Sequence, residues 1–133
     1  MWCYYFGALV AGVGALLHVR FAYIETAGWN LAAVRKIAPS WVAGMSDTEA
    51  DRLIAWAKRL AFNIGIYNLV LALGLAWTCR AFALQAPTAK SLGIFFAVWL
   101  LGAAAAAIST QIVKAFIVQG ALGVLLLIAA LVI

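Results

Sequence analysis

The stretch that decides the fold of this chain is residues 111–133, which read QIVKAFIVQGALGVLLLIAALVI. It carries one charged residue, Lys114, near its start, and one strongly polar residue deep inside, Gln119. A helix needs about 20 mainly apolar residues to cross the ~30 Å hydrocarbon layer of a membrane. Residues 111–133 are therefore predicted to form a transmembrane helix.

Three more apolar runs of suitable length precede this one, at about residues 2–29, 60–82 and 91–108. The composition of the whole chain agrees, because 68% of its residues are hydrophobic and only 10% are charged. Average soluble proteins have roughly 45–50% apolar and about 25% charged residues. We predict one all-α domain over residues 1–133, an integral membrane protein folded as a four-helix bundle.

The first apolar run does not have the pattern of a cleaved signal peptide. It begins Met1-Trp2-Cys3-Tyr4-Tyr5, without a basic segment, and no small-residue cleavage motif follows the apolar stretch. We expect a retained helix. The six Trp and four Tyr of the chain suit the aromatic belts at membrane interfaces.

Residues 30–59 are the only sizeable connection between apolar runs, and the pair Pro39-Ser40 interrupts it. Ser46 and Glu49 have the spacing of a capping box, which predicts a helix start. Apolar residues then recur at helical spacing, at Leu53, Trp56, Ala57 and Leu60. We expect an amphipathic segment at the membrane surface that continues into the second transmembrane helix.

The basic residues predict an orientation. Seven of the nine basic residues lie within residues 30–59 or nearest to that side of the membrane, namely Arg20, Arg35, Lys36, Arg52, Lys58, Arg59 and Lys114. The other two, Arg80 and Lys90, lie at the opposite side. By the positive-inside rule, residues 30–59 are cytoplasmic and both termini face outward. The bases lie between apolar runs and form no basic face, so no nucleic-acid partner is expected.

The two cysteines, Cys3 and Cys79, are expected near the outer face, where either a disulfide or two free thiols packed as small apolar groups would be possible. The chain has no Walker loop, nucleophile elbow, paired His ligands at metal spacing or dinucleotide fingerprint. We expect no metal and no cofactor.

Ionisable residues at membrane depth are candidates for function because they are costly there. His18 and Glu25 are seven residues apart, so they share one face of a helix, and that face continues through the small residues Gly14, Ala11 and Gly7. One interpretation is a proton-titrating or ligand-binding pair inside the bundle. The alternative is that Glu25 pairs with a base such as Arg20 at the cytoplasmic interface, while His18 is a hydrogen-bonded packing residue.

The second apolar helix carries Asn63, Tyr67, Asn68 and Trp77 in otherwise apolar sequence. Its polar groups lie on two sides, one with Asn63, Tyr67, Gly74 and Trp77 and the other with Gly65, Asn68 and Ala72, so we expect helices all around it. Asn63, Tyr67 and Asn68 could bond neighbouring helices, or they could orient a ligand with Trp77 as an aromatic wall. The same two interpretations apply to Gln119.

Together these residues resemble a known family. His18, Tyr23 and Glu25, the string Asn63-x-Gly65-x-Tyr67-Asn68 leading into Leu71-Ala72, and Gln119 in the final helix are similar to the family catalogued as domain of unknown function 1304. The resemblance implies a small bacterial four-helix membrane protein, expected in the inner membrane, and it brings no established activity. The chain departs from the family pattern at Ile64 (Gln in the family), at Leu69 (Gly) and after Gln119 (Pro), which indicates a divergent member.

Three functions are compatible with these features. The favoured one is binding or transport of a small amphipathic or aromatic molecule by His18, Glu25, Asn63, Tyr67 and Trp77, which would need a homodimer for transport because four helices make a narrow pathway. The second is a non-catalytic accessory subunit of a larger membrane complex. The third is an isomerase-type enzyme on a lipid-soluble substrate, with His18 or Glu25 as the acid or base.

Overall fold

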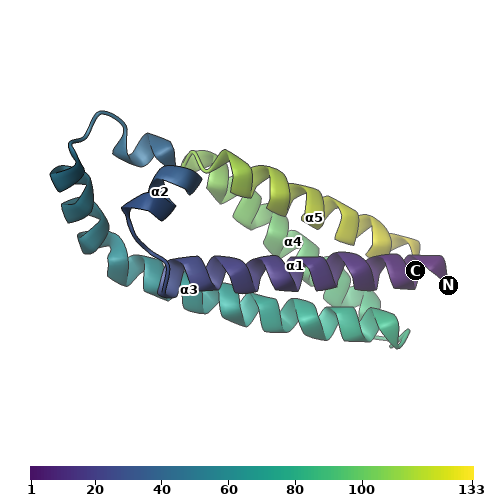
Figure 1. Cartoon of the computed structure of the whole chain (residues 1–133). Helices are drawn as coiled ribbons and strands as arrows, with labels where there is room; N and C mark the ends of the chain where they lie inside the picture. Colours follow the sequence, from purple (N-terminus) through teal and green to yellow (C-terminus); the bar gives the residue numbers. More distant parts are fainter.

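The computed structural model describes residues 1–133 and is entirely helical, which confirms the predicted all-α class (Figure 1). Four of its helices are long and apolar enough to cross a membrane, as in an integral membrane protein. These four are α1 (Trp2–Thr26), α3 (Asp47–Ala83), α4 (Ala89–Ser109) and α5 (Val113–Val132). Between α1 and α3 lie a short helix, α2 (Leu31–Ile37), and one 3-10 turn, η1 (Pro39–Val42).

The long helices form two closely packed antiparallel pairs. Helix α1 packs along α3, and α4 packs along α5. The pairs meet where α1 touches α5 and, over a smaller area, where α3 touches α4. Both termini lie at one end of the molecule, whereas α2 and the first turns of α3 lie at the other (Figure 1). The two pairs therefore meet along two seams, one between α1 and α5 and one between α3 and α4.

The end that carries the termini has a dense apolar core. Gly7 and Gly14 on α1 lie against Phe82 and Leu75 of α3, and a Cβ atom at Gly7 would overlap the Phe82 ring. Phe82 and Leu75 are fully buried, as is Leu126 of α5. The small-residue stripe predicted on the first helix thus lies against protein, because small side chains let two helices approach closely.

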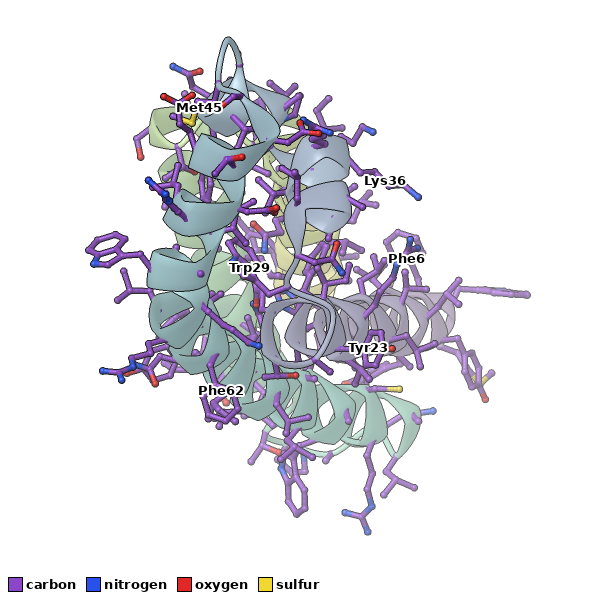
Figure 2. All side chains as sticks on the ribbon, turned by 60° about the vertical axis from the view of Figure 1, so that its left-hand side comes forward. Phe6, Tyr23, Trp29, Lys36, Met45 and Phe62 are labelled. Atoms are coloured by element: carbon purple, nitrogen blue, oxygen red, sulfur yellow. The ribbon has the colours of Figure 1, made fainter.

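The outer surface of the four long helices is apolar. Only 31 of the 133 residues are buried, and large apolar side chains remain exposed on every long helix. Phe6, Tyr23 and Phe62 are examples that project outward from α1 and α3 (Figure 2). An apolar surface of this extent is the kind that a lipid environment covers.

One helix boundary differs from the prediction, and the predicted continuation of the capped segment into the second long helix is confirmed. Helix α1 ends at Thr26 and not near residue 29, because the backbone N–H groups of Ala27 and Gly28 both donate to the Tyr23 carbonyl, each over 2.9 Å. Helix α3 is continuous through 37 residues, about 55 Å at 1.5 Å per residue. The predicted span at 60–82 is its second part. Its first turns swing out of line with the other helices (Figure 1).

The segment predicted as a connection, residues 30–59, has a small core of its own. Val34, Val42, Ala50 and Ile54 are buried together, with Trp29 packed against them. The capping box at the start of α3 is confirmed, since Ser46 accepts from the Glu49 N–H and the Glu49 carboxylate accepts from the Ser46 N–H.

The Trp41 side chain fixes this segment to the far pair of helices. Its indole N–H donates to the Thr110 carbonyl over 2.8 Å, and Thr110 lies in the turn between α4 and α5. The apolar positions predicted along the first turns of α3 lie on the opposite side from the small core, since Leu53, Trp56 and Leu60 are exposed. The first turns of α3 therefore have one apolar face against the small core and another that is exposed.

Both cysteines are free thiols. Cys79 lies level with Gly12, because a Cβ atom at Gly12 would be 3.5 Å from the Cys79 sulfur. Cys3 is nine residues before Gly12 on α1, which is about 13 Å along the helix axis. A disulfide needs Cα atoms within about 7 Å, so of the two open interpretations the structure supports free thiols.

Candidate functional site

A chain of three polar side chains connects α1 to α3 in the half of the molecule nearer α2. The Nδ1 atom of His18 lies 2.6 Å from the Oδ1 atom of Asn68. The Nδ2 group of Asn68 donates to the Oε2 atom of Glu25, also over 2.6 Å. Asn68 thus holds a histidine and a carboxylate of the same helix at once.

The two hydrogen bonds of Asn68 determine which nitrogen of His18 carries the proton. The Asn68 amide has donors only on nitrogen and acceptors only on oxygen, and its nitrogen is turned to Glu25. Its oxygen therefore accepts from His18, so the neutral imidazole carries its proton on Nδ1. The Nε2 atom keeps its lone pair. It is buried and has no hydrogen-bond partner in the protein.

Close packing of α1 on α3 positions the side chains of His18, Asn68 and Glu25. Gly65 lies one helical turn before Asn68, and a Cβ atom there would lie 3.0 Å from the Ala22 carbonyl oxygen and 3.1 Å from the Glu25 Cβ. Only a glycine lets the two backbones approach this closely, which brings Glu25 within reach of the Asn68 amide. The ring of Phe21 packs edge-on to the His18 ring, with centroids 5.5 Å apart.

A cavity of about 710 Å³, here called the aromatic cavity, lies along the seam between α3 and α4. Its polar residues are His18, Asn68, Gln119 and Tyr67, and the rest of its wall is mainly apolar. The aromatic wall consists of Phe95, Phe96 and Trp99, all from α4. The size and the few polar groups are typical of pockets for small molecules.

A second cavity of about 340 Å³, here called the basic cavity, lies between α1, α2 and α5. It is lined by the charged residues Arg20, Glu25, Lys36 and Lys114 together with apolar side chains. Asn68 and Gln119 border both cavities. The polar chain therefore has His18 on the aromatic cavity and Glu25 on the basic one.

The structure brings together four of the candidate residues, namely His18, Glu25, Asn68 and Gln119. His18 and Gln119 are 1% and 8% exposed. The alternative interpretation of Glu25, an ion pair with Arg20, is wrong in this structure, because the only salt bridge joins Arg35 to Asp47 at 2.5 Å. Glu25 instead accepts a hydrogen bond from Asn68.

Three polar or aromatic candidates on the other side of α3 are exposed. Tyr67 lines the aromatic cavity but is 71% exposed, so it lies at the cavity's mouth. Asn63 is exposed in a separate hollow with Lys58 and Arg59. Trp77 is 60% exposed, with the Arg80 guanidinium over its ring at 5.5 Å. The expectation that helices surround α3 on both polar sides is confirmed only at Gly74, which packs against Phe96 of α4, whereas Asn63 and Trp77 on the same side are exposed.

Two groups of lining residues were missed by reasoning from sequence. The aromatic wall carried a usable signal, since Phe95 and Trp99 are four residues apart and so share a helix face. For Arg20, Lys36 and Lys114 the charge distribution predicted a common end of the molecule, but not their convergence on one cavity, because they come from three different helices. No group of three or more His, Cys, Asp or Glu side chains is placed to hold a metal ion.

A comparison with known families agrees with this arrangement. The family described as "Protein of unknown function (DUF1304)" matches residues 12–131. The chain belongs to the DUF1304 family. The match confirms the resemblance noted from the sequence, and it spans the whole polar chain and Gln119. No curated protein and no solved structure gave a significant match.

Proposed function

We propose that this DUF1304 protein binds or transports a small amphipathic or aromatic molecule in the aromatic cavity. The observation that carries the proposal is the buried Nε2 atom of His18, which has no partner in the protein and belongs to a residue that lines the cavity. An unsatisfied buried polar atom costs about 1–3 kcal/mol. A ligand that donates a hydrogen bond there would remove this cost.

The wall of the cavity specifies the rest of the ligand. Phe95, Phe96 and Trp99 offer ring faces and edges, which favour a flat, apolar body. The Gln119 amide supplies a further polar group from α5. The proposed ligand is therefore an aromatic or otherwise apolar molecule with one hydroxyl or N–H donor.

A pair of probes tests this chemistry. 1-Naphthol has the aromatic body and a hydroxyl donor, whereas 1-methoxynaphthalene has the same body and no donor. We expect tighter binding of 1-naphthol, by roughly tenfold for one hydrogen bond worth about 1 kcal/mol or somewhat more. Calorimetric titration of the detergent-solubilised protein, corrected for partition into empty micelles, measures the difference.

A matched pair of variants locates the site. Ala103 lines the aromatic cavity, whereas Ala105 on the same helix is exposed outside it. Ala103→Trp should fill the cavity and abolish 1-naphthol binding, and Ala105→Trp should leave it unchanged. Equal affinity in both variants, or equal affinity for both probes, would contradict the proposal.

Proton coupling of binding is the second part of this proposal. If His18 took up a proton at Nε2, the Glu25 carboxylate, two hydrogen bonds away through Asn68, would balance the new charge. Binding should therefore change with pH in the wild type, and Glu25→Gln should remove that dependence. A pH profile that Glu25→Gln leaves unchanged would count against coupling.

We also propose a membrane arrangement, in which the four long helices form a transmembrane bundle in a bacterial inner membrane with residues 30–59 in the cytoplasm. The seven-to-two distribution of basic residues supports this orientation. In a variant with both native cysteines changed to Ser, Met45→Cys should react with an impermeant thiol reagent only after the cells are opened. Thr88→Cys, between α3 and α4, should react in intact cells.

A further inference from the structure

The basic cavity has features that the proposed ligand of the aromatic cavity does not explain. Arg20 from α1, Lys36 from α2 and Lys114 from α5 all line it. None of the three has a carboxylate within salt-bridge distance, since the only ion pair in the protein joins Arg35 to Asp47. The one acidic residue in the wall, Glu25, accepts from Asn68. Three unpaired cations against one acid leave the cavity with a positive balance.

The remainder of the wall is apolar. Leu17, Phe21 and Ile24 line it from α1, and Ile112, Ala115 and Val118 from the α5 side. An inorganic anion would gain nothing from these side chains. An anionic molecule that also has a hydrocarbon part would contact both the cations and the apolar wall.

A second hollow continues from the basic cavity. It has a volume of about 740 Å³, and Lys36, Ile37 and Lys114 line both spaces. The second hollow runs past Pro39 and Ser40 to Gln111 in the α4–α5 turn. Lys36 projects from α2 at the edge of the molecule (Figure 2). The two lysines therefore stand where a cavity among the helices opens to the outer surface.

The geometry points to a binding site for an anionic amphiphile, with its phosphate held by Lys36, Lys114 and Arg20 and its hydrocarbon part against the apolar wall. Basic pockets between membrane helices recognise phospholipid headgroups in this manner. The proposed ligand of this site is therefore an anionic phospholipid. The site adjoins the aromatic cavity at Asn68 and Gln119 but has its own basic residues. It needs α2 near the start of α5, where the Trp41 hydrogen bond joins the neighbouring η1 turn to Thr110.

Native mass spectrometry in a neutral detergent tests the site. The probes are phosphatidylglycerol and phosphatidylcholine with the same acyl chains, which separate the anionic headgroup from the tails. Each basic side chain near an anionic lipid contributes about a fivefold gain. Lys36→Gln/Lys114→Gln should therefore bind phosphatidylglycerol roughly twenty-five-fold more weakly, and Arg20→Gln about fivefold.

The matched control is Lys58→Gln/Arg59→Gln, which removes the same charge from the same end of the molecule but outside both hollows. It should keep the preference for phosphatidylglycerol over phosphatidylcholine. An equal loss in both double variants would show attraction to net charge and overturn the site. Thermal unfolding of each variant shows that binding, and not folding, has changed.

Inorganic phosphate distinguishes the two sources of the anionic group. We expect millimolar phosphate to compete weakly, because it lacks the apolar part that fills the wall. If phosphate bound as tightly as phosphatidylglycerol and displaced it fully at equal concentration, the proposal of an amphiphilic ligand would be wrong. The site would then bind a free anion.

Discussion

The Oδ1 atom of Asn68 on α3 lies 2.6 Å from the Nδ1 atom of His18 on α1, although the two residues are 50 positions apart in the chain. The same side chain donates to Glu25, 43 positions away. In an apolar surrounding an amide must find partners, and here both come from one neighbouring helix. Asn68 therefore both joins the two helices and sets the chemistry of the histidine.

Asn68→Leu should destabilise the protein by about 1–2 kcal/mol, because His18 Nδ1 and the Glu25 carboxylate both lose their partner. Asn63→Leu makes the same chemical change at an exposed position of the same helix and should have little effect. Thermal unfolding in mild detergent measures both. Similar shifts for the two variants would show that the polar chain contributes nothing specific.

His18 should be protonated on Nδ1 when neutral, since the Asn68 oxygen accepts from that atom. Selective ¹⁵N labelling and the nitrogen chemical shifts of the imidazole report the tautomer directly. In Asn68→Leu the preference should shift toward the Nε2-protonated form common in free histidine. A wild-type spectrum with the proton on Nε2 would contradict the hydrogen-bond chain.

Asn63 and Asn68 show which parts of the structure can be predicted from the sequence and which cannot. Run length and composition predict the four long helices, and the seven-residue spacing predicts that His18 and Glu25 share a face. The two asparagines are five residues apart, about 140° around the helix, so at most one can face α1. Nothing local distinguishes them, because the choice depends on which side of α3 its partners cover.

The linings of the two cavities also depend on which helices pack together, and not on local sequence. Phe95, Phe96 and Trp99 belong to α4, and they become a wall for His18 only because α4 lies beside α3. Arg20, Lys36 and Lys114 converge only when α2 lies beside α5. Such convergence is a property of helix packing, which periodicity along one chain does not record.

The close contact between α1 and α3 should be sensitive to a single methyl group. A Cβ atom at Gly7 would overlap the fully buried Phe82 ring, so Gly7→Ala should destabilise by about 1–3 kcal/mol. At Gly12 the nearest atom is the Cys79 sulfur at 3.5 Å. Gly12→Ala should be neutral or stabilise by up to about 1 kcal/mol through helix propensity.

Thermal unfolding of the two glycine variants under identical detergent conditions gives the comparison. Both changes add the same methyl group to the same helix, so lipid or detergent effects on α1 cancel. If Gly7→Ala were as stable as Gly12→Ala, the Phe82 ring would have to move freely, and the dense core at this end would be wrong.

The turns after α3 and α4 each contain a glutamine in the left-handed backbone region, Gln85 with φ 52° and Gln111 with φ 59°. Helices commonly end in this conformation on Gly, which has no Cβ penalty there. Gln111→Gly should therefore stabilise the protein by about 1 kcal/mol, seen as a higher unfolding midpoint, and Gln85→Gly should do the same. Gln111→Ala keeps the Cβ and should give no gain. A gain as large for Ala as for Gly would show that backbone strain is not the cause.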